Sequence, residues 1–129
     1  MRIFKNRWFA KFAKDEKIHD EKLCHAVSDA EKGLIDADYG GGVIKQRVAR
    51  PNEGKSGGYR TIILYRQEDK AFFVYGFAKH SRKNISKAEE QEFKQLAKLM
   101  FSRSDGDIDI LIKKGALKPV DCHEKSQNL

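Results

Sequence analysis

The sequence predicts an α+β protein, in which a small, mainly antiparallel sheet carries two N-terminal helices and a C-terminal helix packed on it. Three observations lead to this class. Residues 59–66 and 71–78 are rich in Ile, Phe, Val and Tyr and flank a short charged turn, as in a hairpin. Residues 6–34 and 84–101 carry apolar side chains at helical spacing. The 129 residues, 40% of them apolar, have room for one modest core.

The first part of the chain predicts a strand and two helices. Residues 1–5 are expected to form the strand, and Asn6 is placed to cap a helix that ends near Lys14. The core-facing side chains of this helix are expected to be Trp8, Phe9, Phe12 and Ala13. Asp20 is expected to cap a second helix ending near Gly33, with an apolar stripe of Leu23, Val27, Ala30 and Leu34.

The middle of the chain predicts three strands. Three successive glycines at positions 40–42 break the chain sharply. Residues 43–49 then form a strand, on which the period of two places Lys45 and Arg47 on one face. Residues 50–58 are expected to form a polar loop, and the hairpin follows with residues 67–70 as its turn.

The C-terminal part predicts one long helix and a short tail. Ser86 and Glu89 have the spacing of a capping box for a helix that ends near Phe101 and presents an apolar stripe of Phe93, Leu96, Ala97 and Met100. After a break at 104–107, a short helix at 108–114 and a strand at 117–120 are expected, with 121–129 disordered. Residues 1–101 are thus the main body of a single domain, and residues 102–129 an extension of it.

The net charge of the protein is concentrated in one segment. Residues 45–83 hold ten Lys and Arg against three acids, whereas the remainder is balanced, so this segment carries the whole net charge of +7. Clustered positive charge of this kind favours an anionic partner, most often a nucleic acid. The alternative is a generally basic surface that keeps the protein soluble.

The two cysteines and the absence of a signal-like N-terminus predict a reducing compartment, the cytoplasm, and argue against disulfides. Cys24-His25 and Cys122-His123 are pairs of adjacent residues and lack the loop spacing of a structural zinc site, so neither a metal nor another cofactor is expected. No apolar run approaches the roughly 18 residues of a membrane span, so no membrane is expected as a partner.

Arg60 is the first candidate for contact with an anion. Gly57 and Gly58 allow a tight turn just before it, and its guanidinium then begins a rigid central strand from which it is able to fork onto phosphate oxygens. A salt bridge with an acid on a neighbouring element is the alternative.

Cations from two other places are expected to converge with Arg60. Lys45 and Arg47 lie on the strand expected to neighbour the hairpin, and four residues follow the hairpin's second strand: Lys79, His80, Arg82 and Lys83. For the last two, a solvated run of charge at a strand end is an equal alternative.

Several motifs together resemble the RelE/HigB group of bacterial type II toxins, within the RelE/ParE superfamily. They are SGGYR with the strand-turn-strand after it, GFAKHSRKNIS, GGGVIKQRVARP, and the N-terminal RIFK followed by WFAKFAK. The resemblance covers residues 1–101 and implies a RelE-like toxin domain. RelE-type toxins are ribosome-dependent endoribonucleases that enter the ribosomal A site and cut mRNA there. The resemblance therefore implies two partners, mRNA on the ribosome and a cognate antitoxin, often a helix-turn-helix protein in HigB-like pairs.

The resemblance assigns roles residue by residue. Arg60 matches the arginine of the family's Gly-Tyr-Arg motif, which contacts the scissile phosphate. Lys45 and Arg47 stand where the family has alternating basic residues on a strand, and Lys79 matches the lysine after the last central strand. His80 departs from the family, because it stands where RelE has a catalytic arginine.

Ser86 is a second departure, at the position of a RelE tyrosine. Cleavage by the adjacent 2′-hydroxyl needs a proton acceptor, a proton donor to the leaving 5′-oxygen, and stabilisation of the extra charge on phosphorus. Arg60 and Arg47 are expected to stabilise that charge. Lys45 is the candidate base, because crowded cations disfavour one another's charged forms. His80 is the candidate that replaces the missing groups, since an imidazole ordinarily titrates near neutral pH.

The remaining residues of the basic segment are expected to contact RNA outside the cleaved bond. They are Arg50, Lys55, Tyr59, Arg82 and Lys83. Tyr59, Tyr75 and Phe77 are also candidates for stacking on bases, as in readers of single-stranded RNA.

Three other functions remain open at this point. A ParE-like toxin shares the scaffold but inhibits DNA gyrase and leaves RNA intact. A noncatalytic nucleic-acid-binding protein or regulatory subunit would bind in a salt-dependent way without cleavage. A toxin that has lost its activity is the third, because of His80 and Ser86.

Overall fold

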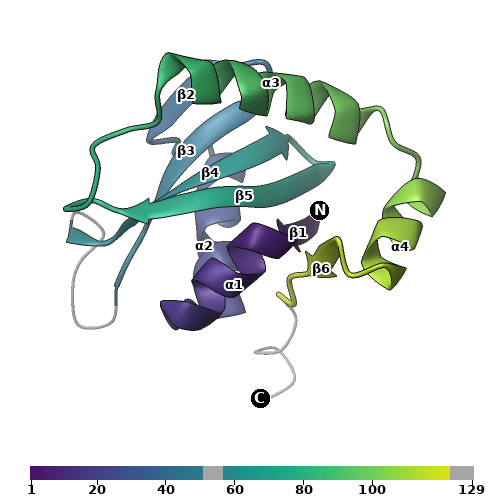
Figure 1. Cartoon of the computed structure of the whole chain (residues 1–129), viewed down its shortest axis with the longest axis horizontal. Helices are drawn as coiled ribbons and strands as arrows, with labels where there is room; N and C mark the ends of the chain where they lie inside the picture. Colours follow the sequence, from purple (N-terminus) through teal and green to yellow (C-terminus); the bar gives the residue numbers. More distant parts are fainter. Residues whose placement is uncertain (51–56, 123–129) are drawn as a thin grey trace.

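The computed structural model describes residues 1–50 and 57–122 of the chain. In these ranges the fold is α+β, as predicted, with four helices and a six-stranded sheet (Figure 1). In chain order the elements are β1 (Arg2–Asn6), α1 (Arg7–Asp15), α2 (Asp20–Glu31), β2 (Ala37–Gly40), β3 (Val43–Val48), β4 (Tyr59–Arg66), β5 (Lys70–Ala78), α3 (Lys87–Phe101), α4 (Asp105–Lys113) and β6 (Leu117–Pro119).

The sheet has the strand order β2-β3-β4-β5-β1-β6 and is mainly antiparallel. The predicted hairpin is confirmed, with β4 and β5 paired from Tyr59 opposite Ala78 to Arg66 opposite Lys70. The one parallel pair joins β1 to β5, and β6 then pairs antiparallel with β1. The predicted strand in the tail is therefore an outer strand of the same sheet.

The helices cover both faces of the sheet (Figure 1). On one face, α1 and α2 pack on a core that includes Ile44, Ile63 and Phe73. On the other, α3 and α4 pack on a core that includes Ile62 and Phe72. Since side chains alternate along each strand, both faces of the central strands are apolar and buried. We refer below to the face under α3 and α4 as the α3 face.

Local signals position the helix ends. The Asn6 side chain caps α1 by accepting a hydrogen bond from the Phe9 backbone N–H at 2.7 Å, as predicted. The predicted capping box of Ser86 and Glu89 begins α3. The predicted break at 104–107 is in fact the start of α4, where Ser104 caps the helix and Asp107 completes a second capping box. The polar residues 104–107 therefore mark the start of a helix and not a loop.

Three predictions about the first forty residues are wrong in detail, and one strand there was not predicted. His19, not Asp20, precedes α2, and the helix ends at Glu31, which leaves Leu34 outside the apolar stripe and 62% exposed. Trp8 is 46% exposed rather than in the core, because Phe9 and Ala13 form the buried face of α1 and Trp8 stacks on Phe12 at the edge of that face. The strand β2, which pairs with β3, was not predicted.

The prediction of free cysteines is also wrong, because Cys24 of α2 and Cys122 form a disulfide across 98 residues of sequence. Sequence separation says nothing about this proximity. It arises because β6 pairs with β1 and the chain then runs past α2. The backbone N–H of Val120 donates to Ile3 O at 2.8 Å, and that of Asp121 donates to Asp20 Oδ2 at 3.0 Å. The cysteines therefore no longer support a reducing compartment.

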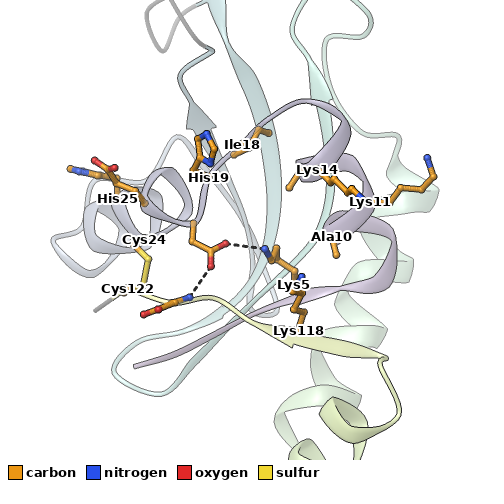
Figure 2. Close-up of a pocket in the computed structure, with 14 residues that line it drawn as sticks. Lys5, Ala10, Lys11, Lys14, Ile18, His19, Cys24, His25, Lys118 and Cys122 are labelled. Carbon is orange, nitrogen blue, oxygen red and sulfur yellow. Dashed lines mark hydrogen bonds and ion pairs between the residues drawn. A yellow bond between two sulfur atoms is a disulfide. The ribbon is translucent and has the colours of Figure 1, made fainter. Parts of the chain in front are cut away.

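Figure 2 shows the disulfide at the edge of a cavity of about 1000 Å³ between α1, α2 and β6. The buried Lys5 ammonium inside it is already paired with the Asp20 carboxylate at 2.9 Å. Lysines and acids both line this cavity, so it is not the concentrated positive site predicted from residues 45–83.

None of the helices in residues 1–50 and 57–122 combines the length and apolar character needed to cross a membrane. Two segments named in the predictions, 51–56 with Lys55 and the tail 123–129, lie outside the described residues.

Candidate functional site

Three of the predicted catalytic cations lie together on β3 and β4. Arg47 is directly opposite Arg60 in the antiparallel pairing, and Lys45 is opposite Ile62, two residues along each strand. Residues directly opposite in a sheet project from the same face, with Cβ atoms about 5 Å apart. All three cations therefore belong to the α3 face, and we call them the cationic row. On the other side of Arg60, the row ends at Phe77 of β5.

Arg60 is the buried member of the row, with 6% of its surface exposed. Burial lowers the pKa of its guanidinium from the ordinary value; the charge of Arg47 lowers it further, and Asp36 raises it. An arginine nevertheless remains charged in proteins. A buried positive charge beside a second one is a strong attractor for an anion, because desolvation strengthens each electrostatic contact.

Asp36 is the site residue that sequence reasoning missed. Its carboxylate lies 3.0 Å from Arg47 Nε and 3.9 Å from Lys45 Nζ, and its side chain is only 17% exposed. Asp36 immediately precedes β2, whose pairing with β3 sets Ala37 opposite Lys45. The available signal was the segment ADYGGGV, because recognising a second hairpin around the three glycines would have brought Asp36 beside these cations.

A buried glutamine on the opposite face holds Asp36 in place. The Gln46 side-chain amide donates to the backbone carbonyls of Ala26 and Leu34, both at 2.9 Å. Its carbonyl oxygen accepts from the backbone N–H of Asp36 at 2.8 Å. Gln46 is 4% exposed, so these bonds satisfy a buried polar group and also fix the segment between α2 and β2. The backbone of Asp36, the acid of the site, is thus held in place.

Lys79 and His80 lie beyond the end of β5, and both are exposed. The backbone N–H of Lys79 donates to Gly58 O at 3.3 Å, which holds this turn beside the start of β4 and close to Arg60 in the chain. His80 lines a different cavity, together with Trp8 and other residues of α1, and the members of the cationic row do not line it. The structure therefore does not bring His80 into the row.

Arg82 is engaged in a structural network. Its guanidinium binds the Glu89 carboxylate in two places, at 2.6 and 3.1 Å, and also donates to the Tyr75 hydroxyl at 3.0 Å. These hydrogen bonds raise the pKa of Arg82, and Arg82 in turn lowers the pKa of Glu89 to about 2. Arg82 thereby ties the end of β5 to the first turn of α3. Ser86, the other departure from the family pattern, caps the same helix.

The remaining predicted RNA contacts among the described residues are Tyr59, Arg50 and Lys83. Tyr59 is 2% exposed and faces the α1 side, where its hydroxyl donates to the Glu16 carboxylate at 2.7 Å. Arg50 lies over the Tyr59 ring, with its guanidinium carbon 5.3 Å from the centroid. Lys83 is exposed on the turn before α3. Among residues 1–50 and 57–122, no cluster of three or more His, Cys, Asp and Glu side chains is arranged to hold a metal ion.

The fold and this row define a class: a small α+β protein with cations gathered on one face of its central strands, suited to holding an anion. A comparison with protein-family models matches residues 1–120 to the family described as the RelE toxin of the RelE / RelB toxin-antitoxin system. The chain therefore belongs to the RelE toxin family and is a toxin of a toxin-antitoxin system, whose partner is an antitoxin. A search among curated proteins finds no match.

Proposed function

We propose that this toxin is a ribosome-dependent endoribonuclease that cleaves mRNA by attack of a 2′-hydroxyl on the adjacent phosphate. The observation that carries the proposal is the cationic row, in which Arg47 and Arg60 lie directly opposite each other. Two guanidinium groups on one rigid surface are suited to a phosphate whose charge increases in the transition state.

The row also supports a division of roles. Arg60, buried and central, contacts the scissile phosphate, and Arg47 shares the charge that develops on its oxygens. Lys45 lies two residues from Arg47 on the same face of β3, and its proposed role is to accept the 2′-hydroxyl proton. Lys79 steers the RNA towards the site from the turn after β5.

His80 remains the proposed donor to the leaving 5′-oxygen, from the cavity next to the row. His80→Ala tests this role. A cleavage rate within a few-fold of wild type, with Arg60→Ala inactive, would exclude His80 from the reaction.

The proposed function is tested by mapping the 5′ ends of an mRNA in a cell-free translation extract. Wild type should produce discrete fragments only while ribosomes translate the message. Arg60→Ala should lose about 10²–10³-fold or more in rate, the usual effect of removing one preorganised charge donor. Arg66→Ala is the matched control. Arg66 is at the other end of the same strand, so this variant should cleave at the wild-type rate. If the mRNA stays intact with wild type, the proposed nuclease activity is wrong, and inhibition of DNA gyrase becomes the function to test.

The partner and the place of action follow from the same proposal. A nuclease that acts on translating ribosomes works in the cytoplasm. We propose that its antitoxin is of the helix-turn-helix type and that it covers the cationic row, since acidic or helical segments complement such a surface. Co-expression of a candidate antitoxin should then protect mRNA in the extract.

A further inference from the structure

A cavity of about 520 Å³ lies between α1 and the adjoining ends of β4 and β5. Aromatic rings supply much of its lining: Trp8, Phe12, Tyr59, Tyr75 and Phe77. Ligand sites are concave and combine apolar surface with polar groups that fix the orientation of the ligand, and this cavity combines its rings with polar and charged side chains. The side chains of Lys45, Arg47 and Arg60 do not line it, whereas His80, the proposed proton donor, does.

Trp8 is the most exposed of these rings, at 46%. Its indole is held by stacking on Phe12, with centroids 5.3 Å and planes 16° apart, and by a tilted contact with Tyr75 at 4.7 Å. The ring is therefore preorganised yet still open to solvent. An aromatic surface fixed in this way binds a planar ligand at a low cost in side-chain entropy.

The polar groups of the cavity suit a nucleotide. Glu16 lines it and accepts a hydrogen bond from the Tyr59 hydroxyl, and a carboxylate has lone pairs for further donors such as a base amino group. Arg50, which lies over the Tyr59 ring, supplies positive charge at the same edge for a phosphate. The cavity thus joins aromatic faces to the Glu16 carboxylate and the Arg50 guanidinium. His80, Ser81 and Arg82 also line it, and the Arg82 guanidinium is bound to the Glu89 carboxylate.

We propose that this cavity binds one nucleobase of the RNA, preferring a base that carries an amino group over uracil. The base stacks on Trp8 while Glu16 accepts from the amino group. Two lining residues are direct neighbours of Arg60, namely Tyr59 in the chain and Phe77 across the sheet. In this proposal, a base in the cavity and a phosphate on Arg60 belong to one stretch of RNA. The identity of this RNA as the cleaved strand rests on the proposed function.

The test uses the fluorescence of Trp8, because it is the only tryptophan of the chain. The full-length Arg60→Ala variant is titrated with GMP, AMP, CMP, UMP and ribose 5-phosphate, with N-acetyltryptophanamide as the control for absorbed light. Saturable quenching by the nucleotides with an amino group, weaker quenching by UMP and none by ribose 5-phosphate are expected. Equal quenching by ribose 5-phosphate, or none by any nucleotide, overturns the proposal; the latter would leave a protein partner as occupant.

Two variants separate this inference from the proposed function. Glu16→Gln should retain quenching and lose most of the preference over UMP. Trp8→Leu, checked for folding by circular dichroism, should raise the KM for cleaved mRNA about 5- to 150-fold, the range for loss of one stacked base, with kcat changed much less. An unchanged KM would contradict the base site. If wild type cleaves no mRNA, the proposed nuclease activity is wrong, but the fluorescence titration still tests whether the cavity binds a base.

Discussion

The disulfide between Cys24 and Cys122 leads to the sharpest prediction about stability. It closes a loop across 98 residues of sequence, so it restricts nearly the whole unfolded chain. The chain-entropy relation gives about 4.7 kcal/mol for a loop of roughly 100 residues, whereas measured effects are typically about 2–4 kcal/mol. We expect Cys122→Ser to lower the free energy of unfolding by about 2–4 kcal/mol. For a chain of this length that corresponds to a drop in Tm of roughly 10 °C.

The assay is urea unfolding of wild type, Cys24→Ser and Cys122→Ser, each with and without reductant. Reductant should bring wild type to the stability of the two variants and should leave the variants unchanged, which controls for other effects of the reagent. Thiol titration of native wild type should find no reactive group. The reasoning is refuted if two thiols titrate in the native protein, or if all three proteins unfold at the same urea concentration under oxidising conditions.

Two further predictions concern charged pairs. Asp36→Asn removes the carboxylate that is paired with Lys45 and Arg47, so RNA binding should depend more steeply on salt. Titrations at several salt concentrations should show the slope of log K against log salt steepen by up to about 0.7. An unchanged slope would contradict a competition between Asp36 and phosphate. Arg82 holds the pKa of Glu89 at about 2, below its unfolded value, so this pair's contribution is present above about pH 4.5 and is lost as the pH falls towards 2. With allowance for solvent screening, urea unfolding at pH 6 and pH 3 should show wild type losing about 1 kcal/mol more than Glu89→Gln; equal losses would show that the pair is not formed.

Local patterns were sufficient for most of the fold. The hairpin of β4 and β5 followed from two apolar runs around a charged turn, and the Asn6 cap and the Ser86 capping box followed from spacing alone. The cationic row was also accessible, because the period of two placed Lys45 and Arg47 on one face and hairpin adjacency placed Arg60 beside them. Each of these inferences needs only residues close in sequence or on neighbouring strands.

The features that were missed depend on contacts between distant parts of the chain. Cys24 meets Cys122 only because β6 pairs with β1, and no local signal announces that pairing. The strand β2 is four residues long and contains neither a strong apolar alternation nor a β-branched run, so its pairing with β3 decides its conformation. Trp8 has the spacing of a core residue, yet it lines a cavity and is 46% exposed. Helical periodicity predicts which face of the helix a side chain is on, but not whether another element covers that face.

Asp36 also changes the argument about proton transfer. The case for Lys45 as the base depended on repulsion among crowded cations, but a carboxylate 3.9 Å from Lys45 Nζ offsets that repulsion. A phosphate that binds Arg47 and Arg60 competes with Asp36 for Arg47, whose Nε lies 3.0 Å from the carboxylate. Two bases are then possible, and they differ in which variant loses the reaction. If Lys45 accepts the proton, Lys45→Gln abolishes cleavage while Asp36→Asn retains it. If the displaced Asp36 carboxylate accepts it, Asp36→Asn abolishes cleavage although RNA still binds, because the arginines that hold the phosphate remain.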